Sequence, residues 1–98
     1  MRQAIALSRN DSDPFNFLAT KYREAGLYQQ AIPLYRTALE IRPRRPDARF
    51  GLALSLLETG DAVAARAQAD TGLSLGQLKS YFDWVRGRAD SAMKRTVP

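Results

Sequence analysis

Apolar residues recur at helical spacing along most of this 98-residue chain. In the first such stretch Phe15, Leu18, Ala19 and Tyr22 stand three or four residues apart, and Gly26 follows them. This spacing gathers the apolar side chains on one face of an α-helix. Glycine commonly ends a helix because it adopts the left-handed turn at little cost. The pattern therefore predicts a short amphipathic helix that ends near Gly26.

A second helix is predicted from about Leu27 to Ile41. Its apolar face contains Tyr28, Ala31, Ile32, Tyr35, Ala38 and Leu39. Asp13 is an N-cap candidate for the preceding helix, and Pro14 fits its first position, where no amide donor is needed. Pro33 falls inside the second helix and removes one backbone hydrogen bond. We expect a slight bend there rather than a break, because the packing of the apolar face offsets the loss.

The same plan recurs at an offset of thirty-four residues. Identical residues at this offset are Asp13 and Asp47, Leu18 and Leu52, Ala19 and Ala53, Glu24 and Glu58, Gly26 and Gly60, Ala31 and Ala65, Thr37 and Thr71, and Leu39 and Leu73. Asp47 is expected to cap a third helix and Asp61 a fourth, which ends at Gly76. A fixed period of this size indicates stacked supersecondary units.

The repeated unit resembles the tetratricopeptide repeat, whose two helices carry large, small and aromatic residues in a set order before a closing proline. The residues that match are Phe15, Leu18, Ala19, Tyr22, Ala31, Tyr35, Ala38 and Pro43. The second unit keeps Leu52, Ala53, Gly60 and Ala65, and it departs at Arg49, Leu56, Ala69, Gly72 and Gln77. The resemblance implies an all-α fold, a right-handed α-solenoid of antiparallel helix pairs.

The resemblance also divides the chain. Residues 13–46 are predicted to form repeat 1 and residues 47–77 repeat 2. Residues 1–10 continue the register backwards as the tail of a preceding half-repeat, with Ile5 and Leu7 on an unfinished apolar edge. Residues 78–95 lose the register but keep an apolar face, which is made of Leu78, Tyr81, Phe82, Val85, Ala89, Ala92 and Met93. We expect this segment to be a capping helix.

Composition narrows the chemistry. The chain has no cysteine and no histidine, so it lacks disulfides, thiolate ligands and the commonest general base. No glycine-rich phosphate loop or metal-ligand cluster occurs, and we expect no catalytic site, no metal and no cofactor. No apolar run is long enough to span a membrane or to act as a secretory signal, which favours a cytoplasmic protein.

In the family that the chain resembles, the first helix of each pair lines a concave groove that binds peptides or helices. The matching positions are Asp13, Asn16, Thr20, Arg23 and Glu24 in repeat 1 and Asp47, Phe50, Leu54, Leu57 and Glu58 in repeat 2, with Tyr81, Trp84 and Arg88 added by the capping helix. Phe50, Leu54 and Leu57 form an apolar stripe separate from the core positions Leu52 and Leu56. Such a stripe suits an amphipathic helix or an extended hydrophobic peptide, unless the capping helix or a neighbouring chain covers it.

The sequence therefore predicts a non-catalytic adaptor or scaffold that binds a protein partner. Three alternatives stay open. The 15 lysines and arginines outnumber the 10 acidic residues, and a basic patch of Arg42, Arg44, Arg45 and Arg49 could bind nucleic acid or another anionic surface. The edge at Ile5 and Leu7 could make a homo-oligomer. The chain could also be a regulatory module of an enzyme.

Overall fold

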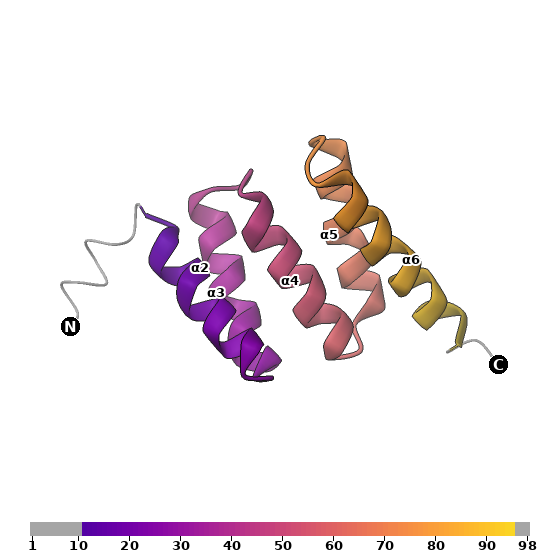
Figure 1. Cartoon of the computed structure of the whole chain (residues 1–98), viewed down its shortest axis with the longest axis horizontal. Helices are drawn as coiled ribbons and strands as arrows, with labels where there is room; N and C mark the ends of the chain where they lie inside the picture. The colour runs from indigo at the N-terminus through magenta and orange to yellow at the C-terminus, as the bar shows by residue number, and fades with distance from the viewer. Residues whose placement is uncertain (1–10, 96–98) are drawn as a thin grey trace.

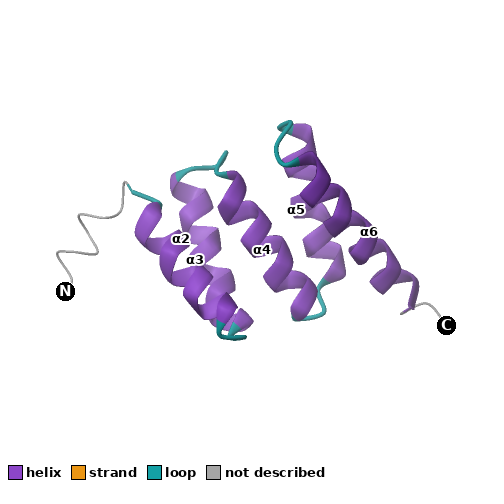
Figure 2. Cartoon of the chain, in the orientation of Figure 1, coloured by secondary structure: helices purple, strands orange, loops and turns teal. Residues whose placement is uncertain are grey.

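The structure, a computed structural model, describes residues 11–95, in which five α-helices and no strand occur. The helices are α2 (Asp13–Glu24), α3 (Tyr28–Ile41), α4 (Pro46–Glu58), α5 (Ala62–Ser74) and α6 (Lys79–Arg95). Consecutive helices run antiparallel (Figure 1) and are joined by short loops (Figure 2). The half-repeat predicted at residues 1–10, with Ile5 and Leu7, lies outside the described residues.

The five helices form two layers. α2, α4 and α6 lie in the nearer layer of Figure 1, and α3 and α5 lie behind them. Each helix packs against the next in the chain, and α4 also contacts α2 and α6 within its own layer. The result is an elongated slab of 50 × 28 × 17 Å. The predicted all-α helical repeat is confirmed.

Two predicted helix caps are wrong. Ser12 rather than Asp13 is the N-cap of α2, and Asp13 is the first helical residue. α4 begins at Pro46 with Arg45 as its N-cap, so Asp47 lies within the first turn. Both carboxylates are instead paired with the Arg45 guanidinium. Asp13 and Asp47 therefore form ion pairs with Arg45 at the starts of α2 and α4, and neither of them is an N-cap.

The remaining helix ends follow the prediction. The Asp61 carboxylate caps α5 by accepting a hydrogen bond from the Ala64 amide at 3.1 Å. Gly26, Gly60 and Gly76 have φ angles of 80°, 89° and 71°, in the left-handed region that glycine tolerates. These glycines reverse the chain after α2, α4 and α5, so the same turn chemistry makes each of the three tight connections.

α3 continues through Pro33. The helix is unbroken from Tyr28 to Ile41, and Pro33 is exposed on its surface. The carbonyl that loses its amide donor belongs to Gln29, which is also exposed, so water can replace the missing bond. The predicted continuity of the helix is confirmed.

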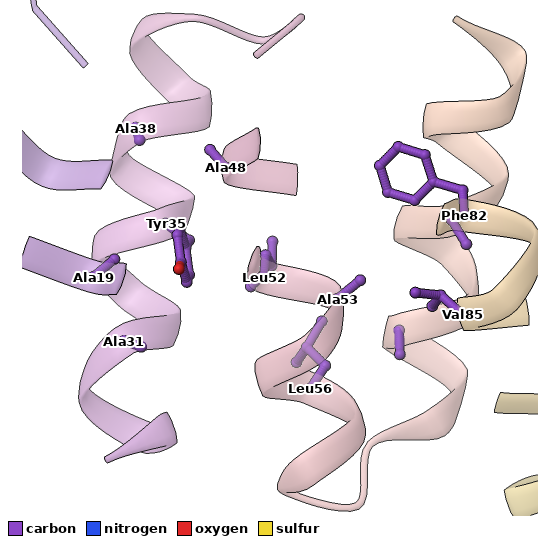
Figure 3. Packing of buried hydrophobic residues seen from close by; sticks show 12 residues of the cluster. Ala19, Ala31, Tyr35, Ala38, Ala48, Leu52, Ala53, Leu56, Phe82 and Val85 are labelled. Carbon is purple, nitrogen blue, oxygen red and sulfur yellow. The ribbon is translucent and has the colours of Figure 1, made fainter. Parts of the chain in front are cut away.

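Small residues let the helices approach closely. Ala19, Ala31, Ala38, Ala53 and Ala65 are all fully buried. Figure 3 shows several of them at the interfaces between the helices, beside the larger core side chains. A methyl group at these positions fills the interface without separating the backbones, which is why the repeat motif places small residues there.

One aromatic side chain connects three helices. Tyr35 of α3 is 1% exposed, and its hydroxyl lies 2.9 Å from Thr20 Oγ1 and 2.9 Å from Arg23 Nε, both on α2. Its ring lies against Gly51 of α4 so closely that a Cβ at that position would overlap it. Gly51 therefore stands in a helix interior because the Tyr35 ring occupies the space of a side chain.

α6 repeats this contact with α5. The ring of Phe82 lies against Gly72, where a Cβ would again overlap it. Phe82, Val85 and Ala89 are fully buried and form the inner face of α6. Two ion pairs add to this contact, Arg86 with Asp70 at 3.2 Å and Arg66 with Asp90 at 3.1 Å. α6 is thus a packed part of the slab.

Three residues that were predicted on apolar faces are largely exposed. Leu18 is 44% and Tyr81 57% exposed. Leu78 precedes α6 rather than belonging to it, and its φ of 40° is unusual for a residue with a side chain. Leu18 lies on α2, the first helix of the slab that the structure describes, and no described helix covers its outer side.

The contact of Tyr35 with Gly51 predicts opposite effects of two glycine substitutions. Gly51→Ala should lower the free energy of unfolding by about 1–2 kcal/mol, since overpacking a core costs more than the gain in helix propensity. Gly87→Ala should raise it by about 0.5–1 kcal/mol, because Gly87 lies in α6 with nothing within 4 Å of an added Cβ. Urea unfolding measures both, and equal effects at the two sites would contradict the contact.

Candidate functional site

The α2–α4 end of the nearer layer is held together by Arg45. Its Nη1 donates to Ser12 Oγ at 2.6 Å and to Asp13 Oδ1 at 2.5 Å. Its Nε donates to Asp47 Oδ1 at 2.8 Å, and Asn16 Nδ2 donates to Asp47 Oδ2 at 3.2 Å. This network joins the start of α2 to the start of α4.

The network shifts the protonation equilibria of its members. The hydrogen bond to Asp47 raises the pKa of Arg45 above its ordinary value, against the opposing effect of partial burial. Burial acts to raise the pKa of Asp47, but the hydrogen bond and the charge of Arg45 outweigh it and lower that pKa below its ordinary value. Both shifts favour the charged forms, so the pair stays ionised at neutral pH.

The predicted basic patch is wrong for two of its four arginines. The Arg45 side chain is 15% exposed and is committed to two carboxylates. Arg49 is 8% exposed, donates to Gln68 Oε1 at 2.8 Å and also donates to the Pro43 carbonyl. Burial lowers the pKa of Arg49. Among the described residues of the patch, only Arg42 and Arg44 are exposed.

A shallow cavity of about 510 Å³ lies beside the loop between α3 and α4 and is lined by residues 42–47. Arg45 lines this cavity, but its charge is already neutralised by ion pairs with Asp13 and Asp47. Arg42 and Arg44 therefore supply the free positive charge of this surface. Two solvated arginines are a weak electrostatic footprint for nucleic acid, which usually engages several cations at once.

The α4–α6 side of the nearer layer contains a pocket whose walls are mainly apolar. This pocket of about 90 Å³ opens between α4 and α6. Its walls are made of Leu54, Leu57 and Glu58 from α4 and Trp84, Arg88 and Ala92 from α6. The Trp84 ring is 50% exposed, and the Arg88 guanidinium carbon lies 5.4 Å from the ring centroid. The pocket has the size for one side chain, with an aromatic ring on its rim.

Phe50 of α4 lies nearer the start of that helix than the pocket residues do, and it packs against α6. Its ring centroid lies 5.2 Å from that of Tyr81 and 6.0 Å from that of Phe82, both in edge-to-face geometry. Phe50 and Leu57 are half-buried and pack on the core. The expectation that Phe50, Leu54 and Leu57 form a stripe separate from the core is therefore wrong, because α6 covers its Phe50 end.

The structure brings together only part of the predicted groove. Leu54, Leu57, Glu58 and Trp84 share the α4–α6 pocket. Of the predicted residues on α2, the side chains of Asn16, Thr20 and Arg23 are bonded to Asp47 or Tyr35 within the slab, and Glu24 is exposed at the end of its helix. The α2 side of the groove is thus mostly a hydrogen-bonded wall.

Sequence reasoning missed two contributors. Ala92 lines the pocket although its position was assigned to the buried face of α6. Its spacing of four residues from Arg88 places both on one helix face and could have indicated this. The bond from Arg23 to the Tyr35 hydroxyl has no local signal, since it depends on how α2 and α3 pack.

Within residues 11–95, no three acidic side chains gather closely enough to hold a metal ion. Every helix in this range is too short or too polar to cross a lipid bilayer.

Comparisons with known proteins agree with the geometry. The sequence profile of the tetratricopeptide repeat family matches residues 22–81. A peroxisomal targeting signal receptor of Candida glabrata is 27% identical over 88 residues, which is 90% of this chain and 15% of the receptor. The chain therefore spans a small part of that relative's length. No solved structure matches the chain at a comparable level of significance.

The Arg45 network predicts an acid-sensitive contribution to stability. Because folding lowers the pKa of Asp47, its contribution is complete above the unfolded pKa of about 3.9 and disappears as the pH falls through the folded pKa. The advantage of the parent protein over Asp47→Asn should therefore be constant near neutral pH and shrink below about pH 4. Urea unfolding across this range measures it.

Glu40→Gln is the matched control, since Glu40 is exposed on α3 and has no ion pair within residues 11–95. Its stability relative to the parent should change less over the same range. An Asp47→Asn difference that persists unchanged at low pH would show that the carboxylate charge is not what stabilises the network.

Proposed function

Because this chain belongs to the tetratricopeptide repeat family, whose repeats generally mediate protein–protein interaction, we propose that it is a non-catalytic adaptor or scaffold module. Its ligand is a peptide or an amphipathic helix that lies on the concave face formed by α2, α4 and α6. The observation that carries this proposal is the pocket between α4 and α6, with its apolar walls and its exposed aromatic rim.

The pocket has the character of an interaction hot spot. Trp84 and Tyr81 are 50% and 57% exposed, so a ligand that covers them removes a large apolar area from water. Leu54 and Leu57 form an apolar wall beside Trp84, and Tyr81 lies against Phe50 nearer the start of α4. Aromatic side chains of this kind dominate many protein interfaces, because they bury much area while few torsions are fixed.

The α2 side supports the groove as a rigid wall. Thr20 and Arg23 are held by the Tyr35 hydroxyl and Asn16 by Asp47, so these side chains need little reordering when a ligand arrives. A surface that is already ordered loses less conformational entropy on binding. Glu24, which is exposed, is the residue of this side that we assign to direct polar contact.

The relative supports a peptide ligand rather than a substrate. That protein is named as a receptor for a targeting signal, and this chain is similar to part of it. The shared segment is 15% of the receptor, so its cargo is not transferred to this chain. Together, this similarity and the pocket between α4 and α6 support recognition of a protein segment.

The rival functions have less support. Binding of nucleic acid or an anionic surface would depend on Arg42 and Arg44, since Arg45 and Arg49 are engaged inside the slab. Self-association has one observation in its favour. Phe17 and Leu18 are 63% and 44% exposed, so α2 has an apolar surface that a second copy of the chain could cover.

The proposal predicts that Leu54→Glu removes partner binding and leaves the fold intact. A carboxylate beside Leu57 and Trp84 would have to be desolvated when a ligand covers the pocket, which should weaken binding at least about tenfold. Affinity capture from native lysate, with and without nuclease treatment, compares the parent protein with this variant, and circular dichroism follows the helices. A protein retained by the parent and lost with Leu54→Glu is the expected result.

Val63→Glu is the control, because Val63 is 70% exposed on α5 and does not line the pocket. It adds the same charge and should retain the captured protein. Capture that survives Leu54→Glu but disappears with high salt or nuclease would replace the groove by the arginine surface. Unfolding of Leu54→Glu would show that Leu54 belongs to the core.

A further inference from the structure

Arg88 differs from Lys79, Arg86 and Arg66, the cations on and beside α6 that form ion pairs. Ion pairs are formed by Lys79 with Asp83 at 2.7 Å, by Arg86 with Asp70 at 3.2 Å and by Arg66 with Asp90 at 3.1 Å. Arg88 is exposed on the pocket rim, and no carboxylate within residues 11–95 pairs with it. The Arg88 guanidinium lies over the Trp84 ring, with its central carbon 5.4 Å from the ring centroid.

This contact prepares Arg88 for a carboxylate. A guanidinium that packs over an aromatic ring is held in place by that ring, while its edge N–H groups stay open to solvent. Those donors form a planar fork that matches the two oxygens of a carboxylate. Because Trp84 already restricts the side chain, binding an acidic group would cost less side-chain entropy than it would for a free arginine.

The apolar pocket lies directly beside this guanidinium. Leu54, Leu57 and Ala92 line it together with Trp84, and its volume of about 90 Å³ excludes a large cofactor. A single bulky apolar side chain fits such a space. The two features occur on one wall, so a ligand that fills the pocket brings its neighbouring residues to Arg88.

Glu58 fixes which side the acidic group takes. It lines the same pocket from α4, is exposed, and forms no ion pair with Arg88. A ligand carboxylate on the α4 side would meet this like charge, whereas one on the α6 side meets the guanidinium. The charge distribution across the pocket is therefore asymmetric.

From these observations we infer that the bound peptide segment carries a bulky apolar residue close to an aspartate or glutamate that is not its C-terminal residue. The apolar side chain fills the space between α4 and α6, and the carboxylate pairs with Arg88 over Trp84. This inference rests on the proposed peptide-binding function and adds the chemistry of the ligand. We assign the acidic group to an aspartate or glutamate side chain, and the test separates it from a terminal carboxylate.

The test uses the full chain and a random dodecapeptide library with amidated C-termini, which removes the terminal carboxylate as a ligand. Selected peptides should share a bulky apolar residue with aspartate or glutamate within one helical turn of it. Arg88→Ala should lower the affinity for these peptides about fivefold, which is the upper range for an exposed ion pair. Arg88→Glu should reverse the selection toward lysine and arginine.

Arg36→Glu is the matched control, since Arg36 is exposed on α3 in the other layer and the charge change is the same. It should leave both affinity and selection unchanged. Peptides that need Leu54 but show no acidic preference and no response at Arg88 would overturn this inference and leave the peptide-binding function standing.

Two further results also decide the question. A second library with free C-termini is therefore screened in parallel, and binding restricted to that library would replace the internal acidic residue by the chain end. Failure to select any peptide that is sensitive to Leu54→Glu would overturn the inference together with the proposed groove.

Discussion

The Tyr35 side chain fixes the geometry on which the rest of the slab depends. It extends from α3 between α2 and α4, with its ring against Gly51 and its hydroxyl bonded to Thr20 and Arg23. Arg23 Nε donates to the Tyr35 oxygen, and the Tyr35 and Thr20 hydroxyls share a hydrogen bond in which either can be the donor, so the buried hydroxyl has two partners. Tyr35 thereby sets the spacing of α2 and α4, and its hydroxyl holds the Thr20 and Arg23 side chains of α2 in place.

The α4–α6 pocket follows from a second contact of the same kind. Phe82 lies on Gly72 and brings α6 close to α5, and Phe50 then packs edge-on against Phe82. This arrangement covers Phe50 but leaves Leu54 and Trp84 farther along the helices with a space between them. The pocket is therefore the place where the packing of α6 against α4 ends, and its apolar walls are the continuation of the core to the surface.

Much of this arrangement could be predicted from sequence because it is local or periodic. The spacing of alanines and the three turn glycines located the helices. The family resemblance assigned Leu54, Leu57 and Glu58 to the groove, with Trp84 added by the capping helix. The exceptions involve long side chains. Arg45 and Arg49 were assigned to a solvent surface, but each bonds groups on another helix, which leaves Arg45 only 15% exposed and buries Arg49. The sequence shows that an arginine is charged, but which groups it pairs with depends on tertiary packing. The structure was therefore needed to show that the α2 side chains are hydrogen-bonded and that the pocket lies between α4 and α6.

The central claim is that a ligand covers the pocket between α4 and α6, and Trp84 reports on it directly. The chain has 1 tryptophan, and it lies half-exposed on the pocket rim. Its fluorescence should be measured while an amidated peptide from the library is titrated, with peptide binding followed separately by anisotropy of a label on the peptide. The account predicts a blue shift of the emission and weaker quenching by acrylamide at saturation. Saturable binding by anisotropy with unchanged Trp84 emission and quenching would place the ligand elsewhere and contradict the account.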